Sequence, residues 1–121
     1  MKIAYIVHPI AGDVHGNVQK ILEIVKGINR TRSNVVPFAP YIADVLVLDD
    51  DDAGQRSRGI GNDMAILKSG IVNELWVYGP RISGGMKAEI ELAFELNIPI
   101  VVMEPDLKWP EWLLRVAIRG Y

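Results

Sequence analysis

Two carboxylate side chains lie at positions where the helical pattern of the sequence places apolar, buried residues. Residues 83–96 have the spacing of a helix, and at about 100° per residue Glu89 falls inside the apolar arc. The apolar arc contains Met86, Ile90, Leu92, Ala93, Phe94 and Leu96. A second long helix is expected from about residue 53 to 69, and Asp63 falls inside its apolar arc in the same way. An inward carboxylate is costly unless a partner or a reaction uses it, so both residues are candidates for chemistry.

A pair of acidic side chains is what the cleavage of a glycosidic bond requires. One carboxylate attacks or stabilises an oxocarbenium-like sugar carbon, and the other, with a pKa raised by burial, handles the proton of the leaving group. A structural role is the alternative for each residue. Glu89 would then bond amides near the start of its helix or a core partner, and Asp63 would bond Asn62, a loop amide or an arginine.

Strand-like and helical segments alternate along the whole chain. Short apolar runs rich in β-branched residues predict buried strands, and apolar residues at helical spacing predict helices. The expected strands are residues 2–7, 34–38, 73–78 and 98–103, and the expected helices are 14–29, about 53–69, 83–96 and 109–118. Residues 39–52 fit either a short helix or an extended stretch. The alternation predicts an α/β fold: a three-layer, doubly wound sheet of flavodoxin or Rossmann type, mostly parallel, with four to five strands in the order 2-1-3-4.

The carboxyl ends of the expected strands indicate where a ligand would bind. In open parallel sheets, ligands bind beyond these ends, at the point where the strand order reverses. The segments at this edge are residues 8–13, 38–52, 78–85 and 104–106. The loop that leads into the helix of Glu89 is one of them, so the sheet topology and the inward carboxylate predict the same place.

Four short motifs occur in order along the first strand and residues 59–98. They are Tyr5 with the following His8-Pro9-Ile10-Ala11-Gly12, then Asn62-Asp63, then Gly84-Gly85-Met86, and then Glu89-Ile-Glu-Leu-Ala93. With these motifs the chain resembles the nucleoside 2-deoxyribosyltransferase family, which includes related nucleoside monophosphate N-glycosidases.

The resemblance implies one nucleoside 2-deoxyribosyltransferase-like domain over residues 1–121. Its activity would be N-glycosidic bond cleavage or base exchange on a (deoxy)nucleoside or a nucleoside 5′-monophosphate. Glu89 would be the nucleophile, Asp63 would bind or protonate the base, and Tyr5 would position Glu89. The remaining candidates for substrate binding are His8, Gly12, Asn62, Arg81, Ser83, Gly84, Gly85 and Met86.

One departure from the family pattern bears on the substrate. Six residues before Glu89, where family transferases often carry an aspartate, this chain has Ser83. A serine hydroxyl, the Arg81 guanidinium and the amides of Gly84 and Gly85 suit a phosphate, which favours a monophosphate substrate. Ser83 also fits a plain helix N-cap. Two alternatives stay open: a protein that binds a nucleotide or nucleotide-derived signal without cleaving it, and an interaction module with a vestigial cleft.

Composition excludes several other classes of protein. The net charge of −2 does not suggest binding to polymeric nucleic acid or to an anionic membrane, and no segment is long enough to span one. The absence of cysteine excludes disulfides and cysteine-ligated zinc. Four consecutive aspartates at 49–52 cannot all point at one ion, so they are interpreted as a solvated loop that caps the next helix. We expect neither metal nor cofactor.

The location and assembly of the protein are expectations of the same kind. A chain of 121 residues with this composition fits a cytoplasmic protein. The resemblance implies that its partner is a small nucleoside or nucleotide. The apolar tail around Trp109 and Trp112 is large for so small a domain, and we expect it to form a homo-oligomer interface.

Overall fold

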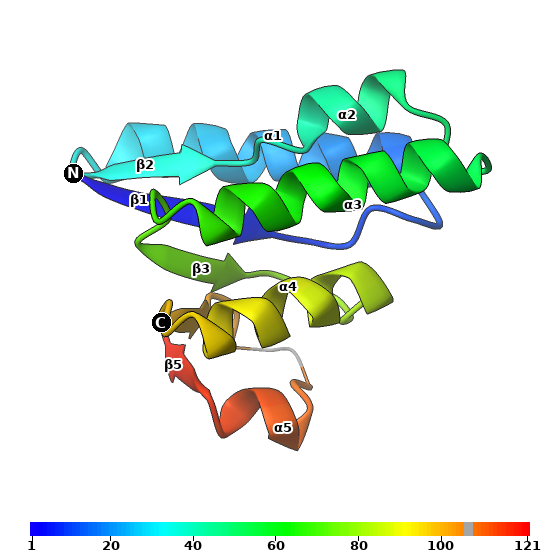
Figure 1. Cartoon of the computed structure of the whole chain (residues 1–121). Coiled ribbons are helices and arrows are strands. Elements are labelled where there is room, and N and C mark those ends of the chain that lie inside the picture. Colours follow the sequence, from blue (N-terminus) through cyan, green and yellow to red (C-terminus); the bar gives the residue numbers. More distant parts are fainter. Residues whose placement is uncertain (106–107) are drawn as a thin grey trace.

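A parallel sheet forms the centre of the protein. The structure is a computed structural model that describes residues 1–105 and 108–121 (Figure 1). Within these residues the sheet has the order β2-β1-β3-β4-β5, and every neighbouring pair is parallel. The strands are β1 (Lys2–Val7), β2 (Val35–Phe38), β3 (Glu74–Val77), β4 (Ile100–Val102) and β5 (Ala117–Arg119). The predicted α/β class and strand order are confirmed, and β5 extends the sheet beyond β4.

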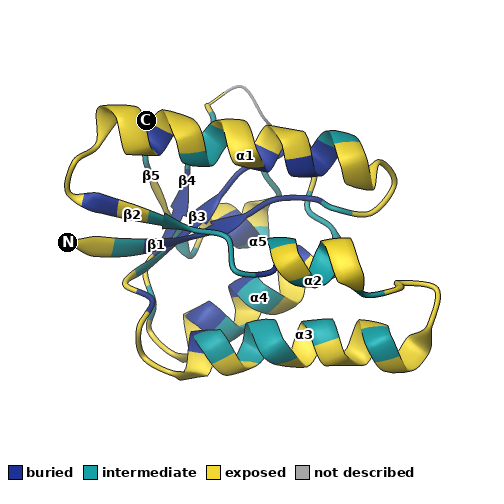
Figure 2. Ribbon diagram, turned by 90° about the horizontal axis from the view of Figure 1, so that it is seen from above, coloured by how far each residue is buried: buried dark blue, intermediate teal, exposed yellow. Residues whose placement is uncertain are grey.

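Helices cover both faces of the sheet. They are α1 (Val14–Thr31), α2 (Ile42–Val47), α3 (Ala53–Lys68), α4 (Gly84–Glu95) and α5 (Glu111–Leu114). Figure 2 shows α1 on one side of the sheet, with α2, α3 and α4 on the other. None of the helices in the described ranges is long and apolar enough to cross a membrane.

The alternation of side chains along β1 divides the core into two layers. Tyr5 and Val7 join the cluster that contains residues of α3 and α4, whereas Ala4 and Ile6 join the cluster that contains Ile28 of α1. Successive side chains of a strand point to opposite faces, so a continuous apolar run is what a strand covered on both sides needs. As a result, Tyr5 faces the layer in which Asp63 and Glu89 lie.

Capping side chains set the start of the long helices. Asp13 accepts a hydrogen bond from the amide of Gly16 at the start of α1, and Asp52 accepts one from Gln55 at the start of α3. These bonds satisfy backbone donors that have no partner in the first turn. The predicted capping role of the aspartate run is therefore confirmed for Asp52.

Two expectations about the helices were wrong. The predicted helix over 109–118 ends at Leu114, because residues 117–119 pair with β4 as a fifth strand. The apolar arc of α4 is also narrower than predicted, since Phe94 is 57% exposed and Leu96 is 40% exposed. The ambiguous segment 39–52 contains the short helix α2.

The edges of the fold bear on three further expectations. The proline in residues 34–38 predicted an edge strand or a strand end, and β2 is indeed the edge strand next to β1.

The predicted ligand segment 104–106 includes Asp106, which lies outside the described residues. Leu114 and Ile118 in the tail are exposed, at 39% and 59%. The homo-oligomer stays a prediction.

Candidate active site

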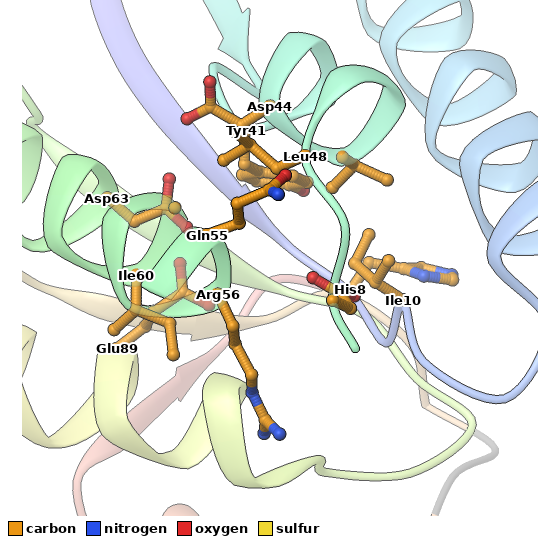
Figure 3. Close-up of a pocket in the computed structure, with 13 residues that line it drawn as sticks. His8, Ile10, Tyr41, Asp44, Leu48, Gln55, Arg56, Ile60, Asp63 and Glu89 are labelled. Carbon is orange, nitrogen blue, oxygen red and sulfur yellow. The ribbon is translucent and has the colours of Figure 1, made fainter. Parts of the chain in front are cut away.

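A pocket lies at the carboxyl end of β1, between α2, α3 and α4 (Figure 3). Its volume is about 160 Å³. The residues that line it are His8, Ile10, Tyr41, Asp44, Val45, Leu48, Asp50, Gln55, Arg56, Gly59, Ile60, Asp63 and Glu89. This is the edge of the sheet where open parallel folds bind ligands, and it lies where the strand order reverses between β1 and β3.

The two inward carboxylates meet in this pocket from separate helices. Asp63 comes from α3 and Glu89 from α4, and both line the cavity (Figure 3). Asp63 Oδ1 and Glu89 Oε2 are buried, and neither has a hydrogen-bond partner among the described residues; the same holds for the Tyr5 hydroxyl. Buried polar atoms without partners are rare because each costs free energy. Asp63 and Glu89 both line the pocket, so their two unpartnered oxygens point to a ligand that would bond them.

Burial changes the acidity of both carboxyl groups. It raises the pKa of Glu89 to about 8; the nearby Tyr5 hydroxyl opposes this rise, and the charge of Asp63 adds to it. Burial also raises the pKa of Asp63 to about 6, and the carboxylate of Asp44 contributes. Both carboxyl groups therefore hold their protons more tightly than free acids do, and the rise in pKa is larger for Glu89 than for Asp63. Two acids with separated pKa values are suited to different steps of a reaction.

Aromatic packing holds the Tyr5 ring in place close to Glu89. The Tyr5 ring meets Phe38 edge-on at 6.4 Å between centroids and meets Tyr41 in a tilted arrangement at 5.8 Å. The Tyr41 hydroxyl donates a hydrogen bond of 2.5 Å to the carbonyl of Ile6, which fixes the Tyr41 ring. Burial and the charge of Glu89 keep the pKa of Tyr5 well above its usual range, so its hydroxyl stays protonated. A fixed, protonated phenol can donate to a carboxylate.

His8 closes the β1 end of the pocket as a neutral ring. Its Nδ1 lies 2.7 Å from the carbonyl of Pro9, which can only accept, so Nδ1 carries the hydrogen and donates it. Burial lowers the pKa of His8. Because the Nδ1 hydrogen is used by the backbone, the remaining nitrogen, Nε2, is an acceptor.

Asn62 orients one of the acids instead of lining the cavity. Its Nδ2 donates a hydrogen bond of 2.9 Å to Asp44 Oδ2. Sequence reasoning identified Asn62 but missed Asp44, together with Tyr41 and Gln55, which also line the pocket. The sequence did contain a signal for these three residues. Tyr41, Asp44 and Gln55 lie in or just after residues 38–52, which follow β2, and ligands bind at the carboxyl ends of the strands in such sheets.

The phosphate candidates lie in a different pocket from the two acids. Arg81, Ser83 and Gly84 line a cavity of about 430 Å³ between α4 and α5. The Ser83 hydroxyl caps α4 by accepting from the amide of Met86 at 3.2 Å. The Arg81 guanidinium donates to the carbonyl of Ala11 at 2.7 Å.

The other three predicted binding residues line neither of these pockets. Met86 is 1% exposed and belongs to the core. Gly12 has a φ of +95°, a conformation that favours glycine, and Gly85 is exposed in the first turn of α4. The structure thus places Asp63, Glu89 and His8 around one pocket. The residues that were predicted to bind a phosphate do not line that pocket.

A substitution of Asp44 tests the electrostatic link between the acids. Asp44→Asn removes a negative charge beside Asp63, so the Asp63 anion is stabilised and its pKa should fall from about 6. Burial, the larger cause, remains, so the pKa should stay above the ordinary value of 3.8. Carboxyl ¹³C chemical shifts followed against pH give the result. Glu91→Gln, on an exposed position of α4, is the matched control, and an unchanged Asp63 pKa in the Asp44 variant would contradict the link.

The fold and the site define a three-layer α/β protein with an acidic pocket at the carboxyl edge of its sheet. The chain belongs to the family described as a domain of unknown function, DUF7768, whose match covers residues 2–103. No curated protein matches the chain with significant similarity.

Two solved structures share the fold. One is a 2-deoxyribosyltransferase from the psychrotolerant bacterium Bacillus psychrosaccharolyticus, characterised as a biocatalyst for nucleoside synthesis. Its TM-score is 0.72 at 12% identity, over 95% of this chain and 82% of that one. The other is a conserved protein from Enterococcus faecalis V583, with a TM-score of 0.62 at 19% identity over 88% of this chain. This chain spans 65% of the length of the Enterococcus protein.

Proposed function

We propose that this protein cleaves the N-glycosidic bond of a (deoxy)nucleoside or nucleoside 5′-monophosphate and passes the sugar to water or to a second base. The observation that carries the proposal is the pair Asp63 and Glu89, which reach one pocket from separate helices with buried, unpartnered oxygens. The fold shared with a 2-deoxyribosyltransferase supports a nucleoside as the substrate.

The proposed reaction divides into two displacements. The Glu89 carboxylate attacks the anomeric carbon, the carbon–nitrogen bond breaks, and its electron pair leaves with the base. Asp63 gives a proton to the departing base nitrogen, and the sugar remains as an ester of Glu89. Water or a second base then attacks the same carbon and restores the carboxylate, while Asp63 takes up a proton. The Tyr5 hydroxyl positions the Glu89 carboxylate by a hydrogen bond.

The pKa values of the two acids favour the opposite assignment, in which Asp63 and Glu89 exchange their roles. The pKa is raised further for Glu89, to about 8, than for Asp63, to about 6, which favours Glu89 as the group that carries a single proton of the pair. In that state Asp63 would stabilise the sugar carbon and Glu89 would protonate the base. The pair titrates as a unit, so either assignment gives a rate that rises through the lower pKa and falls through the higher one.

A substrate panel tests the proposed function. Nucleosides and nucleoside 5′-monophosphates, with ribose or deoxyribose, are incubated with the protein in the presence and absence of an acceptor base. We expect chromatography to detect a released free base, with a rate maximum between about pH 6 and 8. A second nucleoside formed from the acceptor would identify a transferase. No release from any substrate at any pH in this range would count decisively against glycosidic cleavage.

The alternative function is binding without cleavage. The observation that favours it is the raised pKa of Glu89, because a protonated carboxyl is a poor nucleophile and a good hydrogen-bond donor. Native mass spectrometry would then detect an intact nucleoside or nucleotide on the protein. The variant Glu89→Gln would retain that ligand, because an amide can also donate a hydrogen bond.

A further inference from the structure

A second pocket lies on the side of α4 that faces away from the two acids. The residues that line it are Pro80, Arg81, Ile82, Ser83, Gly84, Lys87, Lys108, Trp109, Pro110 and Trp112. We propose that it is a separate binding site for a small phosphorylated ligand that carries a planar ring.

The charge of the second pocket is opposite to that of the first. Arg81, Lys87 and Lys108 line it, and none of its described lining residues is acidic. The pocket of Glu89 is lined by four acidic side chains and by one arginine, Arg56. On a chain with a net charge of −2, such a concentration of cations attracts an anion to this place.

Two tryptophans give the pocket planar, apolar walls. Trp109 and Trp112 are half-buried, and Trp109 Nε1 donates a hydrogen bond of 2.9 Å to the carbonyl of Glu104, which fixes its ring. The Lys87 ammonium lies 5.7 Å from the centroid of the Trp112 ring. Aromatic faces bind planar rings by stacking, and the adjacent ammonium groups can bind the phosphate of the same molecule.

The cations are only partly neutralised by protein groups. Among the described residues, Arg81 donates one hydrogen bond, to the carbonyl of Ala11, which holds the guanidinium in place. A guanidinium has five N–H donors, so it can bind a phosphate at the same time. Lys87 has one acidic partner within the described residues, Glu91, at 3.8 Å, and both side chains are more than half exposed. An exposed pair at this distance contributes little, so it competes weakly with a bound anion.

Helix α4 separates this site from the acidic pocket. Glu89 points to the side of α4 that packs on α3, whereas Lys87 points to Trp112 of α5. A ligand between α4 and α5 is therefore not the substrate of the proposed reaction, and either site can be present without the other.

The indole N–H signals of the tryptophans test the second site directly. The probe is adenosine 5′-monophosphate, titrated into the Glu89→Gln protein, in which the proposed reaction is blocked. We expect the Trp109 and Trp112 signals to shift along a saturating curve. The signal of Trp76, which is 3% exposed and lies in the other core layer, should stay in place. Adenosine should bind at least ten-fold more weakly, and inorganic phosphate should compete with the nucleotide.

Charge removal supplies the second arm of the experiment. Lys87→Gln combined with Lys108→Gln should weaken the nucleotide at least ten-fold, because both ammonium groups are lost while the side-chain stems remain. Lys26→Gln on α1 removes the same charge far from the pocket and should change nothing. The proposal is overturned if the Trp109 and Trp112 signals do not move with millimolar nucleotide, if adenosine binds as tightly, or if the double variant binds equally well. None of these outcomes affects base release in the acidic pocket.

Discussion

Glutamine in place of Glu89 is expected to reduce base release by about 10⁴-fold, measured as kcat/KM by chromatography of the free base. The amide has nearly the same shape as the carboxyl group, so the pocket and its packing should stay intact. It cannot attack the anomeric carbon, and it cannot give up a proton as a carboxylic acid does. The loss is therefore expected under either assignment of roles to Glu89 and Asp63.

Glu91→Gln is the matched control, because it changes the same side chain on the same helix. Glu91 is exposed, and its contact with Lys87 is long, at 3.8 Å. Its replacement should alter kcat/KM by less than two-fold. If Glu89→Gln keeps more than a tenth of the wild-type activity, neither assignment of Glu89 in the reaction holds.

A substrate with a leaving group that needs no proton separates the two assignments. If Asp63 protonates the base, Asp63→Asn should lose far less activity on a p-nitrophenyl deoxyriboside than on a nucleoside, while Glu89→Gln loses activity on both. If the roles are exchanged, Glu89→Gln shows the milder loss on the activated substrate. The comparison uses the same two variants and the same assay.

The candidate site was predictable where a charged residue interrupts a long periodic segment. Helix α3 has 16 residues and α4 has 12, so their apolar arcs are defined by several positions, and an acid inside each arc is visible. The long helix α1 and the strand β1 were predicted for the same reason, because each contains several apolar residues at the spacing of its element. In these segments local pattern and tertiary packing agree, which is why their bounds were close to those observed.

The parts that were missed depend on contacts that the local pattern does not contain. Helix α2 has six residues and none that is buried, so it is too short to show a helical pattern of apolar residues. Tyr41 and Asp44, at the start of this helix, were missed for the same reason. Strand β5 has three residues and exists through its pairing with β4. A helical wheel also does not say which neighbour each side meets. Arg81 and Ser83 were assigned to the site of Glu89 from the family resemblance and from their place in the loop before α4, although they line the pocket on the α5 side.

The raised acidities of the two carboxyl groups have a consequence for stability. In the folded protein the pKa is about 8 for Glu89 and about 6 for Asp63, against ordinary values of 4.5 and 3.8. The folded state therefore binds protons that the unfolded chain has already released over this interval. The contribution of these two groups to the free energy of unfolding is fully present below about pH 4. It is lost as the pH rises through the folded-state pKa values of about 6 and 8.

Glu89→Gln should consequently make the protein more stable at pH 8.5 than the wild type, by on the order of a few kcal/mol. The neutral amide avoids the cost of burying a charge, while at pH 5, where the wild-type carboxyl is protonated, the two proteins should differ little. Urea unfolding at pH 5, 7 and 8.5, extrapolated to water, measures the difference. Glu91→Gln should follow the wild type at every pH. A constant difference between the Glu89 variant and wild type across this range would mean that Glu89 is not a buried acid with a raised pKa. A difference that widens with pH would show that burying the Glu89 carboxylate costs the fold stability, which is the expected cost of an acid kept for binding or catalysis.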